Sequence, residues 1–359
     1  MFELAPALQH VFGVLRGFLT LHGVPPAVAL IVSKAIETNI VVLLVALIPM
    51  ALVYAERKVS AFMQARLGPM NVGPWGLFQT LADGIKLMFK EDVVPIGANK
   101  WAHFLAPVIA VGPCFICFAP LYFGKGLIPV DLDTGVLFIF AVSGVSTIGI
   151  LLAGWGSGNK FSMLGGLRGA AQLLSYEIPR VLSVVPVLMW YGSMSLRTIA
   201  QAQQGRWFHV FPKWFIFYPV IGQVAFLIFL IASVAETNRT PFDIPEAESE
   251  LVAGFHTEFS GLKFALFFLA EYAYVFVASA MATALFLGGG DGFILPNGLI
   301  PSWIWFILKT FAMVFLFLWF RWTYPRLRID RLMQFCWKFL MPWSIANIAL
   351  TGFLVLVKP

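Results

Sequence analysis

The feature that most constrains this chain is a series of long apolar stretches with very little charge. About 20 apolar residues in an α-helix span the ~30 Å hydrocarbon core of a bilayer. Eight such stretches predict eight membrane-spanning helices: Ala35–Tyr54, Ala102–Phe123, Gly135–Trp155, Ala170–Tyr191, Trp214–Ala235, Leu262–Leu287, Pro301–Trp322 and Trp337–Val357. We therefore expect an all-α polytopic membrane protein.

The composition supports this conclusion and argues against a soluble enzyme. Hydrophobic residues make up 60% of the 359 residues and charged residues only 12%, whereas soluble domains carry about 25% charged residues. A chain with so few polar side chains could not cover its own surface in water. No polar segment reaches the roughly 50 residues of a separate domain, so we expect no soluble catalytic domain.

Two stretches outside the spans have the pattern of amphipathic surface helices. In residues 1–34 the apolar side chains share one helical face, which indicates an interfacial N-terminal extension rather than a cleaved leader. Between Trp75 and Met88 the apolar side chains again share one face, which would lie on the membrane surface or against a partner. We therefore divide the chain into this extension and an eight-helix membrane domain at 35–359.

The distribution of Lys and Arg predicts which loops face the cytoplasm. Fifteen of the 24 Lys and Arg residues follow spans one, three, five and seven, against seven on the opposite side. Cytoplasmic loops are the ones enriched in Lys and Arg. The predicted cytoplasmic loops are therefore 55–100, 156–169, 236–261 and 323–336, and both termini are expected on the outer side.

Residues that could hold an electron carrier are scarce. The three cysteines are Cys114, Cys117 and Cys336, and a four-ligand metal or iron–sulfur site needs more soft donors than these. None of the five histidines is central in a span, where a facing pair could hold a haem. We expect no metal site and no redox cofactor bound to this chain.

Four ionisable residues fall inside the predicted spans, where charge is costly. They are Glu177, Arg180, Glu271 and Lys309, and each costs about 2.5–3.5 kcal/mol at a helix centre on insertion scales. Glu177 and Arg180 are three residues apart and could neutralise each other. Glu271 has no such neighbour, so it must face the bundle interior, water or Lys309. Proton transfer or ion passage is the default hypothesis for such carboxylates.

The loop between the fifth and sixth predicted spans is strongly acidic. From Glu236 to Glu258 it carries six carboxylates and one arginine, Arg239. Asp243 is expected to cap a helix in which Glu246 completes a capping-box-like pair. Capping explains two of the acids at most. Crowded carboxylates titrate together, some with raised pKa values, although a simple solvated acidic loop is an open alternative.

Several motifs in this order along the chain closely resemble the signature of the H-subunit family of respiratory complex I. This is the bacterial form of the first mitochondrially encoded core subunit of the proton-pumping NADH:quinone oxidoreductase. The matching runs are Ala55-Glu-Arg-Lys58, Arg66-Leu-Gly-Pro69, Leu81-Ala-Asp-Gly-Ile-Lys86, Gly165-Gly-Leu-Arg168, Ser175-Tyr-Glu177, Glu236-Thr-Asn-Arg-Thr-Pro-Phe-Asp243 with its continuation to Glu258, Glu271-Tyr272 and Pro325-Arg-Leu-Arg-Ile-Asp330. The N-terminal ~30 residues lie outside this resemblance, and Arg180 is not part of the signature.

The resemblance implies that the chain forms the membrane side of a quinone-binding chamber and couples quinone reduction to proton translocation. The residues that it implies for the chamber are Glu56, Arg57, Arg66, Arg239, Phe242, Asp243, Glu246 and Glu248. The residues that it implies for proton coupling are Glu177, Glu236, Glu250, Glu258 and Glu271.

The resemblance also implies the setting of the protein. Quinone is the substrate, and the iron–sulfur clusters and FMN belong to peripheral-arm partner subunits. Small membrane subunits, antiporter-like subunits and phospholipids complete the partners, with no nucleic acid. The implied location is the bacterial cytoplasmic (inner) membrane, with periplasmic termini.

Two other interpretations of the sequence stay open. The first is the related membrane subunit of an energy-converting hydrogenase, which shares the fold but need not reduce quinone. The second is an ion or proton transporter, which also uses intramembrane acids. No internal repeat with paired broken helices, the usual mark of transporter binding sites, is found in the sequence.

Overall fold

The structure is a computed structural model that describes residues 20, 25–125, 127–207, 211–246, 248–292 and 300–357. Within these residues the chain is almost entirely helical, which confirms the predicted all-α membrane fold. A two-residue antiparallel pairing of β1 (Arg206–Trp207) with β2 (Phe211–Pro212) is the exception.

Eight long helices are described, and shorter helices and turns lie in the segments between them. The long helices are α2 (Pro26–Met63), α4 (Lys100–Cys117), α5 (Gly135–Gly156), α6 (Lys160–Tyr191), α8 (Ile221–Glu236), α10 (Gly261–Phe286), α11 (Ser302–Thr323) and α13 (Met341–Val357). The short ones are α3 (Gln79–Phe89), α7 (Leu196–Ala202), α9 (Glu248–Leu251) and α12 (Ile329–Phe335), with 3₁₀ turns at Pro74–Gly76, Phe215–Phe217 and Gly254–His256. A π-helical turn, Cys336–Leu340, joins α12 to α13.

Among the described residues, six helical segments are long and apolar enough to cross a membrane. They comprise α4, α5, α6, α10, α11 and the continuous segment Ile329–Val357. The remaining two expected spans correspond to α2 and α8, which contain the shorter apolar segments Pro26–Ile36 and Ile221–Glu236. Helix α8 begins later than the predicted Trp214 because Pro219 and a 3₁₀ turn precede it.

Helix α2 is longer than the span that the sequence predicts at Ala35–Tyr54. It begins at Pro26. Proline is favoured at the first helical position, because the N–H that it lacks would have no partner in the helix there. It therefore crosses the expected boundary between 34 and 35 without a break. The part of the proposed interfacial extension at residues 1–19 and 21–24 lies outside the described residues.

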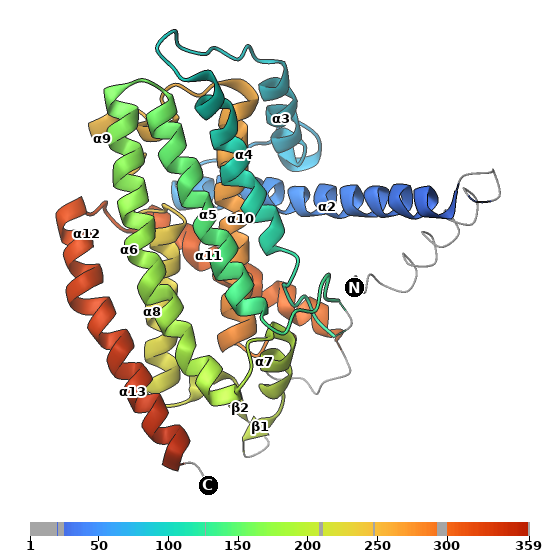
Figure 1. Cartoon of the computed structure of the whole chain (residues 1–359), viewed down its shortest axis with the longest axis vertical. Helices are drawn as coiled ribbons and strands as arrows, with labels where there is room; N and C mark the ends of the chain where they lie inside the picture. Colours follow the sequence, from blue (N-terminus) through green and yellow to red (C-terminus); the bar gives the residue numbers. More distant parts are fainter. Residues whose placement is uncertain are drawn as a thin grey trace.

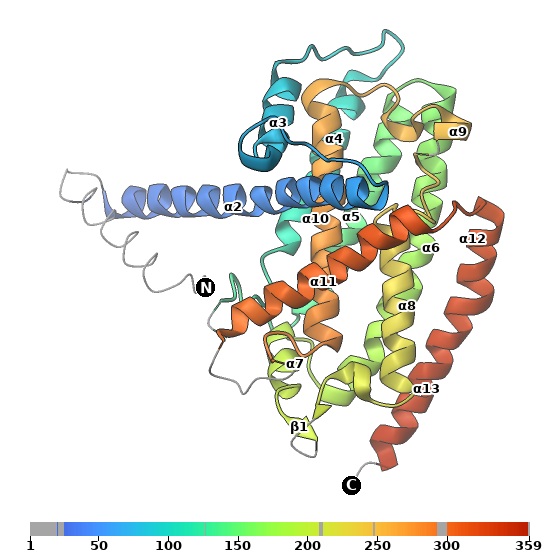
Figure 2. The same cartoon turned by 180° about the vertical axis from the view of Figure 1, so that it is seen from behind.

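The helices differ in their direction. In Figure 1, α4, α5, α6, α8, α10 and α13 run roughly along the long axis of the molecule, whereas α2 lies across them. Figure 2 shows α11 crossing obliquely and ending close to α12. One end of α2, the end of α11 and the loop after α8 therefore meet beside the middle of α10.

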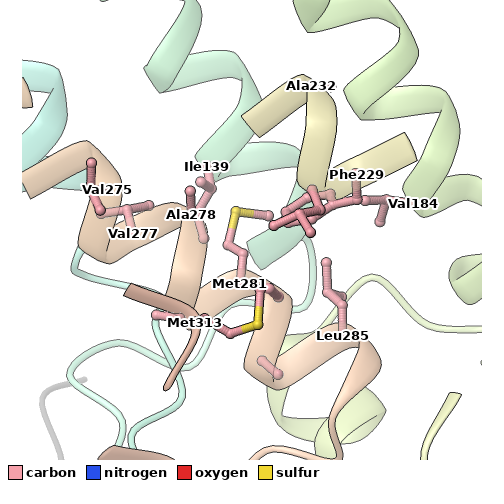
Figure 3. Packing of buried hydrophobic residues seen from close by; sticks show 14 of the residues in the cluster. Ile139, Val184, Phe229, Ala232, Val275, Val277, Ala278, Met281, Leu285 and Met313 are labelled. Atoms are coloured by element: carbon pink, nitrogen blue, oxygen red, sulfur yellow. The ribbon is translucent and has the colours of Figure 1, made fainter. Parts of the chain in front are cut away.

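Helix α10 forms the centre of the hydrophobic core. Its apolar side chains are contacted from α5 by Ile139, from α6 by Val184, from α8 by Phe229 and from α11 by Met313 (Figure 3). Met281 of α10 is fully buried among them. Because this packing surrounds the second half of α10, residues 275–286, polar residues there are shielded from lipid.

The predicted amphipathic surface helix is present as α3. Its apolar residues Leu81, Ile85 and Met88 are exposed on one side. On the other side Asp83 forms an ion pair with Arg57 of α2, with Oδ2 of Asp83 2.5 Å from Nη1 of Arg57. The apolar face of α3 therefore remains available to the membrane or to a partner, as the sequence predicted.

Candidate functional site

The loop that follows α8 is held against the bundle by a buried glutamine. Nε2 of Gln172, on α6, donates to the carbonyl oxygens of Ala235 at 2.7 Å and Phe242 at 2.8 Å. The backbone N–H of Leu327 donates to the carbonyl of Pro241 at 3.0 Å. These hydrogen bonds fold the acidic loop back over the helices and carry Arg239 into the interior.

Two arginines and two glutamates form a buried charged network. Nη1 of Arg239 lies 2.6 Å from Oε2 of Glu56, and its Nε lies 2.8 Å from Oε1 of Glu271. Arg321, at the end of α11, pairs with the other oxygen of Glu56 at 2.7 Å. The four groups are electrically balanced, which is how a protein interior tolerates charge.

Arg239 is the centre of this network. The residue is only 2% exposed, and its guanidinium carbon lies 4.3 Å from the ring centre of Tyr272. Burial alone would lower the pKa of Arg239, but the carboxylates of Glu271 and Glu56 raise it above its ordinary value. Arg239 is therefore a permanent cation.

Two further acids of the loop have partners of their own. Oε1 of Glu246 lies 2.7 Å from Nε2 of His256, and Asp243 pairs with Arg326 at 3.1 Å. Burial and then the nearby Glu246 raise the pKa of Asp243, although Arg326 opposes them. Burial would also raise the pKa of Glu246, but His256 and the more distant arginines lower it overall.

The expected capping role of Asp243 and Glu246 is wrong. No helix begins at Asp243: among the described residues, the next helix is α9, which starts at Glu248. Asp243 and Glu246 bind side chains from distant parts of the chain instead. The expectation that some of these carboxyls have raised pKa values holds for Asp243, whereas the neighbouring His256 lowers the pKa of Glu246.

A cavity lies between this loop and the middle of α10. Its volume is about 50 Å³. A cavity needs about 10–15 Å³ to hold one water molecule, so a few waters fit. Its lining includes Glu236, Glu246, His256, Glu271 and Tyr274. The cavity thus places the last residue of α8, the acidic loop and α10 around one common space.

His256 is the functional candidate that the sequence analysis missed. The residue is 6% exposed and lies among the rings of Phe255, Phe264 and Phe267. Its Nε2 contacts Glu246, while its Nδ1 has no hydrogen-bond partner among the described residues. In the sequence, His256 stands in the Gly254-Phe-His256 run close to the acids of the loop. That position alone does not indicate a contact between His256 and Glu246.

Arg180 does not pair with Glu177, contrary to what their spacing suggests. Its guanidinium binds Glu236 of α8 in an ion pair and lies near the rings of Phe140 and Phe229. Glu177 instead approaches Gly144 on α5, where an added Cβ would lie 2.8 Å from its carboxylate oxygen. Arg180 therefore gives Glu236 a fixed counter-charge and leaves Glu177 separate.

Lys309 is not the partner of Glu271 either. Its Nζ donates to the carbonyl oxygens of Leu287 and Gly289, at 2.6 and 3.1 Å, and lies 3.9 Å from the ring centre of Trp214. These groups follow the end of α10, so Lys309 caps that helix end. Its role in the structure is a local one.

Other residues implied by the resemblance lie apart from the cavity. Arg57 pairs with Asp83, exposed Arg66 donates to Gln64 at 2.6 Å, and half-exposed Glu250 pairs with Arg168 at 2.7 Å. The carboxylate of Glu258 accepts from Asn159 at 2.6 Å. Phe242 packs against the ring of Tyr176, with centroids 5.5 Å apart. The side chain of Glu248 lies outside the described part of the structure.

The described residues contain no group of three or more His, Cys, Asp or Glu side chains placed to hold a metal. Cys114 and Cys117 are buried thiols that lie near backbone carbonyls of Ala270 and Ile139, each at 3.7 Å. They are used as small hydrophobic side chains between helices.

Gly254 fixes the shape of the loop that carries His256. Its φ is +57°, and an added Cβ would lie 1.7 Å from the carbonyl oxygen of Pro245. Gly254→Ala should therefore push Pro245 and Glu246 away from His256 and lower any activity that depends on their contact by about tenfold or more. Gly192→Ala is the matched control, because Gly192 has φ +64° but no neighbour within 4 Å of an added Cβ. Equal activity of the two variants would contradict this prediction.

Comparison with known proteins identifies the family. A family model described as NADH dehydrogenase matches residues 36–352. The NADH-quinone oxidoreductase H subunit of Anoxybacillus flavithermus is 51% identical over 302 residues, which cover 84% of this chain and 87% of the relative. The chain belongs to this H-subunit family. The H subunits of Carboxydothermus hydrogenoformans (48% over 304 residues, 84% of this chain and 83% of the relative) and Bacillus cytotoxicus (50% over 301 residues, 84% and 87%) are similar to it as well.

Membership of the H-subunit family confirms the resemblance seen in the motifs. The matched region contains every residue of the charged network and the cavity, and it leaves the first 35 residues outside. The chain is therefore a multi-pass membrane subunit of an enzyme complex, NADH-quinone oxidoreductase, and the other subunits of that complex are its partners.

Proposed function

We propose that this chain forms the membrane side of the quinone chamber and transmits quinone reduction to proton translocation through its buried acids. The chamber wall is assigned to Glu56, Arg57, Arg66, Arg239, Phe242, Asp243, Glu246 and Glu248. Proton coupling is assigned to Glu177, Glu236, Glu250, Glu258 and Glu271. The observation that supports the proposal best is the cavity that joins Glu246 of the acidic loop to Glu271 in the bundle.

The charged network suits a role next to a redox-active headgroup. Reduction of a quinone to a quinol consumes two protons and passes through anionic forms. At ~6 Å and an effective dielectric constant near 20, a unit charge shifts a neighbouring acid by ~2–3 kcal/mol, or about two pKa units. Such a change is large enough to move a proton between acids that share one cavity.

The contacts suggest an order for the proton transfers. Glu246 contacts Nε2 of His256, and Nδ1 of His256 has no hydrogen-bond partner among the described residues. Both His256 and Glu271 line the cavity. An imidazole can accept a proton at one nitrogen and release another proton from the second. We assign the step from Glu246 through His256 and cavity water to Glu271 as the entry to the acidic path. Glu236, held by Arg180, forms the opposite wall of the cavity.

The proposed setting follows from the family. Electrons arrive from an iron–sulfur cluster of a peripheral-arm partner subunit, and FMN in the same arm receives them from NADH. Antiporter-like membrane subunits receive the signal from the acidic path. The excess of Lys and Arg in the loops 55–100, 156–169 and 323–336 supports the cytoplasmic placement of these loops, and of 236–261 on the same side, in a bacterial inner membrane, with both termini periplasmic.

Glu271→Gln tests this function in the purified complex. The amide keeps the shape of Glu271 but cannot carry a proton, so NADH:quinone turnover and proton pumping should both fall about tenfold or more. NADH oxidation by ferricyanide should be unchanged, because it uses only the electron entry site. Glu91→Gln, at an exposed acid of the first cytoplasmic loop, is the matched control and should behave as wild type. Wild-type turnover and proton-to-electron ratio in Glu271→Gln would remove Glu271 from the mechanism.

A further inference from the structure

We propose that the groove between α8, α11 and α12 binds an anionic phospholipid, with an acyl chain in the groove and the phosphate on exposed basic residues of α12 and its flanking turns. The groove shares Phe242 with the proposed chamber wall, but its headgroup cations lie outside the charged network and the cavity, and lipid binding does not depend on the proposed quinone chemistry.

The groove is apolar and is built from five segments of the chain. Its volume is about 280 Å³, and its lining includes Val234 of α8, Phe320 and Tyr324 at the end of α11, Leu327 of the following linker and Phe335 of α12. Phe242 of the acidic loop lies at its inner side. Figure 2 shows α8, α11 and α12 meeting on this flank of the molecule. A groove of hydrocarbon and aromatic groups at the surface of a membrane protein matches the chemistry of an acyl chain.

The segment that borders the groove is strongly basic. Residues 321–338 contain five Lys or Arg and a single acid, Asp330. Arg321 and Arg326 pair with Glu56 and Asp243. The other three are exposed and form the headgroup cations of the proposed site: Arg328, Arg331 and Lys338. Arg328 lies 3.8 Å from Asp330, and because both side chains are exposed this ion pair is weak.

The helix places these cations beside the groove. Arg331 precedes Phe335 by four residues, so the two share one face of α12. Lys338 follows Phe335 by three residues within the π-helical turn. Trp322, Tyr324 and Trp337 are exposed nearby, and such aromatic residues mark the membrane–water interface. The basic side chains therefore lie on the segment that borders the groove, where the headgroup of a lipid is expected if its acyl chain occupies the groove.

The charge favours a phospholipid over a quinone tail or a neutral lipid. A quinone is uncharged and gains nothing from three exposed cations. An anionic phosphate gains from each of them, and one basic side chain near an anionic surface contributes about fivefold to binding. Arginine in addition binds phosphate oxygens in pairs. An acidic segment of a partner subunit would use the cations but would leave the hydrocarbon groove unfilled.

Photo-crosslinking of the purified complex in lipid nanodiscs tests the site. Phosphatidylglycerol with a diazirine in its acyl chain should label Val234, Leu327 or Phe335, and it should do so about a hundredfold more than phosphatidylcholine with the same chain, the product of the three single effects. Arg328→Gln with Arg331→Gln should lower phosphatidylglycerol labelling about 25-fold, the square of the single effect, and leave phosphatidylcholine labelling unchanged. Lys86→Gln with Lys90→Gln, at exposed lysines in and just after α3, is the matched control and should change neither.

A second variant tests whether the acyl chain occupies the groove. Leu327→Trp should fill the groove and remove the acyl-chain labelling of Phe335, while the headgroup cations stay in place. Equal labelling by the two phospholipids would overturn the proposal, because the groove would then hold any lipid. Stronger labelling by a photoreactive quinone, or cross-linking of the groove mainly to another subunit, would overturn it in favour of those occupants.

Discussion

Arg239→Met should abolish quinone-linked turnover and prevent most of the complex from assembling. The substitution leaves Glu271 buried without its cation, while Glu56 keeps Arg321 as a partner. Removal of one partner from a buried ion pair costs about 3–5 kcal/mol, a large part of the stability of an ordinary domain. The fraction of assembled complex on a native gel and its melting temperature measure this loss.

A compensated variant separates the structural loss from the chemical one. Arg239→Met together with Glu271→Met removes one cation and one anion and leaves the Glu56–Arg321 pair. Assembly should return towards wild type, because no buried charge is left unpaired, whereas quinone-linked turnover should stay about a hundredfold below wild type, the scale of a lost acid–base group. The prediction would be contradicted if Arg239→Met alone melted like the wild type, since the network would then carry no stability.

His256→Gln should lower quinone-linked turnover about a hundredfold while the complex still assembles. Glutamine can keep a hydrogen bond to Glu246, but it cannot take a proton at one atom and release it from another. Loss of a positioned acid–base group typically costs 10²–10⁴-fold in rate, and about a hundredfold is the lower end of that range. Steady-state NADH oxidation with quinone, alongside ferricyanide reduction as a measure of electron entry, provides the comparison.

His103→Gln is the matched control for this experiment. His103 is also buried, and its Nε2 lies 3.3 Å from the carbonyl oxygen of Glu258, but it does not line the cavity. Its substitution by glutamine should change turnover less than about threefold, because no proton step is assigned to it. An equal loss in both variants would show that any change at a buried histidine disturbs the enzyme, and the proton step through His256 would have to be abandoned.

Most of the fold could be predicted from the sequence, because an apolar run long enough to span a bilayer is a local property of the chain. The predicted Gly135–Trp155 differs from α5 by a single residue at its end. The errors fall where local chemistry competes with length. Helix α4 ends at Cys117 rather than at Phe123, with Pro120 shortly after, and α6 begins at Lys160, where the side chain of Asn159 caps it.

The candidate site could be predicted in part. The intramembrane Glu271 and the crowded loop were identifiable, because ionisable residues in an apolar run are costly and need a reason. Their partners were not identifiable. Spacing suggested Arg180 for Glu177, and Lys309 was one of three alternatives for Glu271, whereas the structure pairs Arg180 with Glu236 and Glu271 with Arg239. His256 was overlooked because its contact with Glu246 depends on the turn at Gly254.

The sequence by itself determined that this protein is a helical membrane protein of the H-subunit family with acids where lipid would exclude them. Hydrophobic length and motif order carry that information residue by residue. Only the tertiary structure decided which charge neutralises which and where water can enter. The reason is physical: a Coulomb interaction depends on distance between atoms, and α2, α10, α11 and the loop after α8 bring Glu56, Arg239, Glu271 and Arg321 within contact only after they pack.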